Sequence, residues 1–77
     1  MDHHRLYTEL ERAVGQYGIY RTCLENISPE RELFLAIAQD VYEDFFLQPG
    51  VQGIVSAHAI HLLIFDPETE EILQWIS

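Results

Sequence analysis

The sequence contains no lysine, and only four arginines stand against thirteen aspartates and glutamates in its 77 residues. The formal net charge is therefore −9. Nucleic-acid binding normally begins with a basic patch that displaces the counterions of the phosphate backbone. We therefore expect no direct nucleic-acid binding by this chain alone. Its charge is typical of a solvated surface, and also suits an inhibitor or DNA mimic that occupies a basic groove.

Cysteine is almost absent as well. The single Cys23 excludes an intramolecular disulfide and fits a reducing compartment, so we expect a cytoplasmic protein. We interpret Cys23 as a small buried apolar residue. Nothing in the sequence has the length and apolar character of a signal peptide or a membrane span, so no membrane association is predicted.

Metal-binding patterns are also missing. His3 and His4 are adjacent, His58 and His61 are three apart, and no spacing resembles a structural zinc site. We interpret the acidic run from Asp66 onward as a solvated turn. The prediction is that the chain binds no metal and no cofactor.

The first half predicts one long helix. Larger apolar residues recur every three or four positions between Leu6 and Leu24, which is the spacing of one helix face. Asp2 is a candidate cap, and Ser28-Pro29 should end the helix because proline disfavours helical geometry in the residue before it. Two glycines inside it, Gly15 and Gly18, predict a close backbone approach by another element.

The second half predicts a strand, two short helices and a hairpin. The apolar run within Glu32–Ala38 is typical of a strand covered on both sides. Residues 39–47 have a helical pattern, Gln48-Pro49-Gly50 should break it, and a further short helix is expected over 51–57. Residues 61–65 and 71–76 predict a β-hairpin around a proline-containing turn.

The predicted order is thus α-β-α-(α)-β-β, an α/β arrangement with the long helix packed on a sheet in a single domain spanning residues 1–77. With only three strands in the sheet, the apolar strand within Glu32–Ala38 lacks the neighbouring strands that would cover it. The pattern therefore predicts a partner chain or self-association into a homo-oligomer.

Three ordered blocks resemble the XisH family, the fdxN element excision controlling factors of cyanobacteria. The helix segment AVGQYGIYR, residues 13–21, is similar to a helix of that family. The strand and helix within residues 29–46 and the hairpin within residues 60–76 are similar to the elements that follow. The resemblance covers about residues 10–77.

The resemblance implies a partial restriction-endonuclease-like fold, the C-terminal half of a truncated XisH. It implies that the strands carrying an Asp and a Glu-x-Lys precede Met1, and that Mg²⁺ or Mn²⁺ belongs only to the full-length form. It also implies that Gln16, Tyr20 and Arg21 match the family's motif helix, and that an XisI-like protein is the partner. Since the lysine is absent, the chain is expected not to be an enzyme and to contain no catalytic residue.

We therefore expect an accessory factor of DNA element excision that acts through protein partners. Without neighbouring carboxylates, Gln16 is interpreted as satisfied by nearby backbone and Tyr20 as a packing residue. Two alternatives remain open. One is the small acidic interaction protein named above, an inhibitor or DNA mimic, and the other is a remnant without function.

Overall fold

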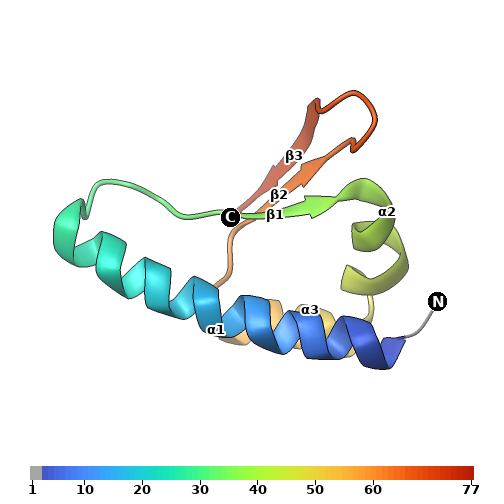
Figure 1. Ribbon diagram of the computed structural model, residues 1–77, viewed down its shortest axis with the longest axis horizontal. Helices are drawn as coiled ribbons and strands as arrows, with labels where there is room; N and C mark the ends of the chain where they lie inside the picture. The colour runs from blue at the N-terminus through green and yellow to red at the C-terminus, as the bar shows by residue number, and fades with distance from the viewer. Residues whose placement is uncertain (1–2) are drawn as a thin grey trace. The chain divides into compact units, whose positions relative to one another are not determined.

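The computed structural model describes residues 3–77 and divides into two compact units, of which one ends at Leu33 and the other is Phe34–Ser77. Figure 1 shows the elements of each unit in chain order. The order is one long helix, a strand, short helical segments and a two-stranded hairpin. The predicted α/β class and element order are confirmed.

The first unit consists of helix α1, His3–Ile27, and the segment that follows it. The helix extends three residues beyond the predicted stripe at each end, and its last turn closes where Ser28 N donates to Leu24 O at 2.7 Å. The predicted end before Pro29 is thus confirmed. Asp2, the candidate cap, lies outside the described residues.

The two glycines of α1 do not mark a close approach. A Cβ added at Gly15 or at Gly18 would meet no atom within 4 Å beyond the helix's own local backbone. The predicted close contact is therefore wrong. Both glycines lie within a continuous helix and neither has a positive φ, so no conformational need for glycine is present.

The second unit opens with strand β1, Leu35–Ala38, and a helical segment of mixed type. The segment consists of α2, Gln39–Val41, followed by the π-helix Tyr42–Phe46. The prediction of one ordinary helix over 39–47 is wrong in type. A π-helix closes its hydrogen bonds over five residues, so successive side chains diverge less around the axis. Phe45 and Phe46 are consequently both buried, with ring centroids 5.6 Å apart in an edge-to-face contact.

Helix α3, Pro49–Ala57, begins at the residue that we expected to interrupt the chain. Proline suits the first helical position because it needs no hydrogen-bond partner there and its φ is already helical. The short helix is confirmed, and the break at Gln48-Pro49-Gly50 becomes a helix start. Val51 and Val55, one turn apart, are buried and fix the inward face.

The C-terminus of α3 ends in a Schellman motif. Ile60 N donates to Val55 O at 3.0 Å and Ala59 N donates to Ser56 O at 3.1 Å. The motif requires a residue in the left-handed backbone conformation between the helix and the segment that follows it, and Ala59 has φ 50°. Glycine normally occupies this position.

Strands β2, Leu62–Phe65, and β3, Ile72–Ile76, form the predicted hairpin. β2 lies between parallel β1 and antiparallel β3, and Leu62 and Ile64 are buried. In the connecting turn, Asp66 Oδ1 accepts a hydrogen bond from Glu68 N at 2.9 Å, so the expected solvated turn is confirmed. Glu70 has φ 63° in this turn.

β1 is less covered than its sequence predicts. It lies at one edge of the sheet with only β2 beside it among the described residues, and its burial is intermediate with Ala36 exposed. Full cover on both sides, expected from the apolar run, is therefore not found. The run is explained partly by Phe34, which precedes the strand and contacts Trp75 at a ring-centroid distance of 5.0 Å.

Candidate functional site

The three motif residues of α1 lie within little more than one helical turn. Gln16 and Tyr20 are four residues apart and therefore share a face, and both are exposed. Tyr20 is 59% exposed, so its interpretation as a packing residue is wrong. The predicted common face is confirmed, and it offers an amide and a phenol to solvent.

Arg21 is positioned by Tyr17, a residue of the apolar stripe of α1. Its guanidinium carbon lies 5.2 Å from the ring centroid of Tyr17, within the range of a cation–π contact. The Tyr17 hydroxyl donates to Leu33 O at 2.7 Å. Tyr17 thus anchors the segment after the helix and holds Arg21 on the helix surface. The four-residue spacing of Tyr17 and Arg21 in the sequence could have predicted this contact, because residues four apart are neighbours on a helix surface.

This motif face has the chemistry of a hydrogen-bonding surface. A guanidinium offers a planar set of donors that matches phosphate or carboxylate, and an amide and a phenol can each donate one further bond. Each of these groups could contribute a hydrogen bond to an oxyanion or an acidic side chain, although Arg21 is stacked on Tyr17 and lies off the face that Gln16 and Tyr20 share. A nucleophile or an acid–base pair would need additional residues.

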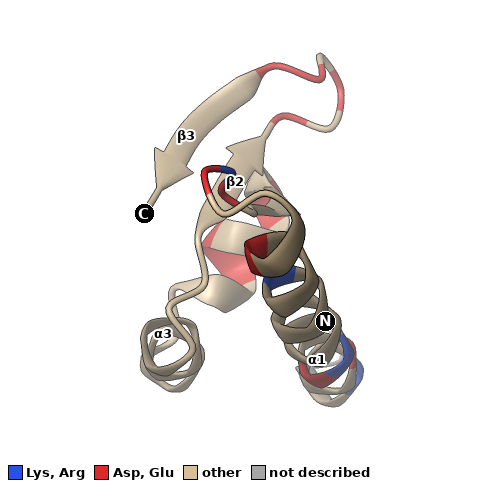
Figure 2. Ribbon diagram, turned by 90° about the vertical axis from the view of Figure 1, so that its left-hand side faces the viewer, with Lys and Arg blue, Asp and Glu red and all other residues tan. Residues whose placement is uncertain are grey.

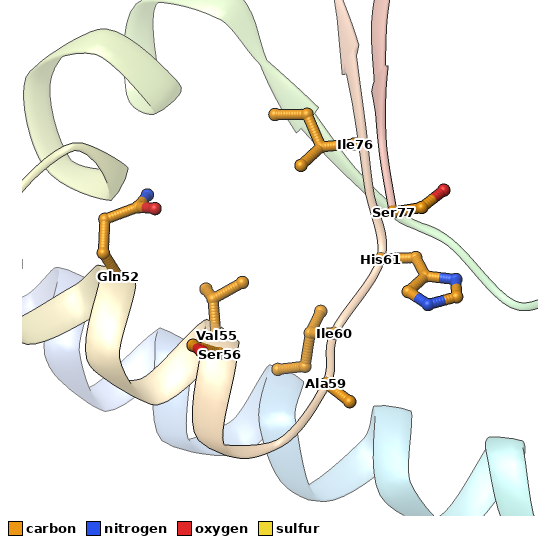
Figure 3. A pocket seen from close by; sticks show the side chains of 8 residues that line it. All are labelled: Gln52, Val55, Ser56, Ala59, Ile60, His61, Ile76 and Ser77. Carbon is orange, nitrogen blue, oxygen red and sulfur yellow. The ribbon is translucent and has the colours of Figure 1, made fainter.

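A cavity of about 350 Å³ lies in the second unit, away from the motif residues in sequence. Figure 3 shows that its lining comes from α3, from the segment before β2 and from the end of β3. The lining residues are Gln52, Val55, Ser56, Ala59, Ile60, His61, Ile76 and Ser77. The Gln52 side-chain amide donates to Phe46 O, so its amide nitrogen caps the π-helix. The motif residues Gln16, Tyr20 and Arg21 do not line this cavity.

Charge is distributed unevenly between the two units. All four arginines precede Phe34, and residues 34–77 contain seven acidic side chains and no arginine or lysine. The seven are Asp40, Glu43, Asp44, Asp66, Glu68, Glu70 and Glu71. Figure 2 shows red along the turn between β2 and β3. The second unit therefore presents a surface of one sign.

The hairpin also exposes large apolar side chains. Ile72, Leu73 and Trp75 of β3 are 50%, 45% and 57% exposed. Several exposed apolar side chains on one strand mark an interaction surface more often than single scattered ones do. This surface directly follows the acidic turn in sequence.

The remaining features concern metal-binding side chains, membrane-spanning helices and Cys23. Within residues 3–77, no group of three or more His, Cys, Asp or Glu side chains is arranged to hold a metal ion. No helix in the described part of the chain has the length and apolar character needed to cross a membrane. Cys23 is exposed, so its expected burial is wrong, because it lies off the apolar stripe of α1.

Comparison with known proteins now identifies the family. The family model described as XisH protein matches residues 2–73. The chain belongs to the XisH family. Among solved XisH structures, a family protein from Nostoc punctiforme PCC 73102 is 35% identical with a TM-score of 0.90. An fdxN element excision controlling factor protein from Anabaena variabilis is 34% identical with a TM-score of 0.89.

Both XisH structures are longer than this chain. Each alignment covers 92% of the chain, but only 56% of the Nostoc protein and 55% of the Anabaena protein. The chain thus spans just over half the length of these XisH relatives. No curated protein matches it.

Proposed function

We propose that these residues act as a non-catalytic accessory factor in the excision of an fdxN-type DNA element, working in the cytoplasm through a protein partner of the XisI type. The observation that carries the proposal is the XisH match over residues 2–73, together with a relative described as an fdxN element excision controlling factor. The partner role is a proposal for this chain, whose length is about half that of the solved relatives.

The non-catalytic part of the proposal rests on the composition of these 77 residues. In the restriction-endonuclease-like fold that the resemblance implies, a lysine stands beside metal-binding carboxylates, and this sequence has no lysine. Gln16, Tyr20 and Arg21 would then orient a phosphate or a partner's acidic group. Mg²⁺ or Mn²⁺ would belong to a longer form of the protein.

Plasmid cleavage tests the non-catalytic role. We expect the purified chain to leave supercoiled plasmid intact in Mg²⁺ or Mn²⁺, with a restriction enzyme as the positive control. Cleavage lost in a Gln16→Ala, Tyr20→Phe double variant would place chemistry on α1. Cleavage retained in that variant would place it elsewhere in the chain. Either outcome would contradict the proposal.

Binding to an XisI-like protein tests the partner role. We expect calorimetry with the XisI-like protein encoded nearest to this gene to give a saturable complex. An exposed surface of opposite charge on the partner should make association faster at low salt. A chain that binds no XisI-like protein at micromolar concentrations would refute this partner.

The excess of acidic residues favours a second candidate function. Seven acidic side chains without a lysine or arginine in residues 34–77 suit a protein that occupies the basic groove of a nuclease or DNA-binding protein. Salt-sensitive binding to a basic nuclease, combined with no affinity for an XisI-like chain, would favour this inhibitor or DNA mimic. The reverse pattern would favour the accessory factor.

A further inference from the structure

The outer edge of β3 is built like an acceptor for another strand. Within residues 3–77, β3 pairs with β2 alone, so the backbone groups on its other side are not used by the sheet. Natural sheets usually protect such an edge with lysine, proline or an inward-pointing charge. Ile72–Ile76, with the sequence ILQWI, contains none of these. A β-bulge can also protect an edge, and the β2–β3 ladder has a register shift between Ile64 and Phe65. Beyond this shift, Gln74–Ile76 pairs regularly with Leu62–Ile64, so the edge of these three residues is regular.

The side chains of β3 provide a binding surface in addition to the backbone. Ile72, Leu73 and Trp75 are each about half exposed, and these three lie within four consecutive positions. The edge contact with Phe34, at 5.0 Å between ring centroids, restrains the Trp75 indole without covering it. Tryptophans held in this way commonly dominate the energy of protein interfaces.

The negative charge beside the open edge of β3 favours a partner strand that carries positive charge. Glu70 and Glu71 directly precede β3, and the turn also contains Asp66 and Glu68. A second copy would bring no lysine or arginine from its own residues 34–77 to meet these carboxylates. A strand from a basic protein would bring lysine or arginine side chains to these carboxylates.

We propose that β3 accepts, as an added strand, an extended segment of a partner protein that alternates apolar residues and places lysine or arginine beside Glu70 and Glu71. This mode of recognition draws affinity from backbone hydrogen bonds and specificity from alternate side chains and end charges. It rests on the proposed role as a partner-binding factor, and it adds the surface and the chemistry of the segment that binds.

Synthetic peptides test the surface directly. The probes are fluorescent peptides of alternating valine and threonine with two lysines at either end, and twins with two glutamates instead. We expect the better lysine peptide to bind about ten-fold more tightly than its glutamate twin at low salt, since two ion pairs replace two repulsions. A Glu70→Lys, Glu71→Lys double variant should reverse this preference, which a merely unfolded variant could not do.

Two matched variants locate the binding site. Leu73→Lys should weaken the lysine peptide about ten-fold, because it places a natural edge-blocking charge on β3. Ile27→Lys, at an apolar residue of α1 that is 80% exposed, should leave binding unchanged. Equal binding of the twin peptides, no binding of any peptide, or equal loss in both variants would each overturn the proposal.

The same variants separate this proposal from the proposed function. An XisI-like chain that binds the wild type and Leu73→Lys equally would sustain the accessory role and refute the β3 site. A lysine peptide that binds at β3 when no XisI-like chain binds would sustain the site and refute that partner. Self-association abolished by Leu73→Lys, with neither peptide bound, would assign the edge to a second copy and overturn the proposal.

Discussion

Replacing Ala59 by glycine should stabilise the protein, although glycine usually destabilises. Ala59 has φ 50° at the left-handed position of the Schellman motif that ends α3. The left-handed conformation costs an L-residue about 1–2 kcal/mol through the approach of its Cβ to the following carbonyl. Glycine has no Cβ and avoids this cost.

The expected gain in stability from Ala59→Gly is smaller than the full cost of the left-handed conformation. Glycine loses more conformational entropy on folding, which offsets about 0.5–1 kcal/mol of the benefit. The net increase in the free energy of unfolding should therefore be about 0.5–1 kcal/mol. For a chain of this size, 1 kcal/mol corresponds to roughly 4–8 °C in Tm, so the expected shift is about 2–8 °C.

Urea and thermal unfolding followed by circular dichroism measure this difference. The matched control is Ala13→Gly, the same chemical change in the interior of α1. This control should lose about 0.5–1 kcal/mol, because glycine is a poor helix former. Equal destabilisation by both variants would refute the left-handed geometry of Ala59. A cooperative transition in the wild type would also contradict a remnant that cannot fold.

Three further predictions use the same measurement. Glu70→Gly should be about 1 kcal/mol more stable than Glu70→Ala, since both remove the carboxylate but only glycine relieves the left-handed φ of 63°; equal stability would contradict this turn geometry. Tyr17→Phe should lose about 1 kcal/mol by deleting the hydrogen bond to Leu33 O, and should speed proteolysis after α1, whereas unchanged stability would show that the bond contributes nothing. Gly15→Ala and Gly18→Ala should each add up to about 1 kcal/mol, because a methyl group has room and alanine favours helix; a loss would reveal a contact at that position.

Local patterns in the sequence were enough to predict most of the secondary structure. The apolar spacing along Leu6–Leu24 and the Ser28-Pro29 signal predicted α1, and two apolar runs around Asp66-Pro67 predicted the hairpin. These succeeded because helix periodicity, strand runs and turn residues act over a few neighbouring positions. The same blocks carried the resemblance to the XisH family, which the family match confirmed.

Features that depend on several contacts at once could not be predicted in this way. The π-helix brings the adjacent Phe45 and Phe46 into the core together, and no periodic pattern in the sequence distinguishes it from an ordinary helix. The anchoring of Arg21 by Tyr17 depends on where Leu33 returns to the helix.

The composition alone determined the acidity and the absence of lysine, because these properties belong to the residues whatever their arrangement. Tertiary structure decided which apolar side chains are left uncovered. Strand order places β3 at an edge, where Leu73 and Trp75 remain exposed beside an acidic turn. Periodicity alone cannot reveal this surface, since a central strand and an edge strand can have the same sequence pattern.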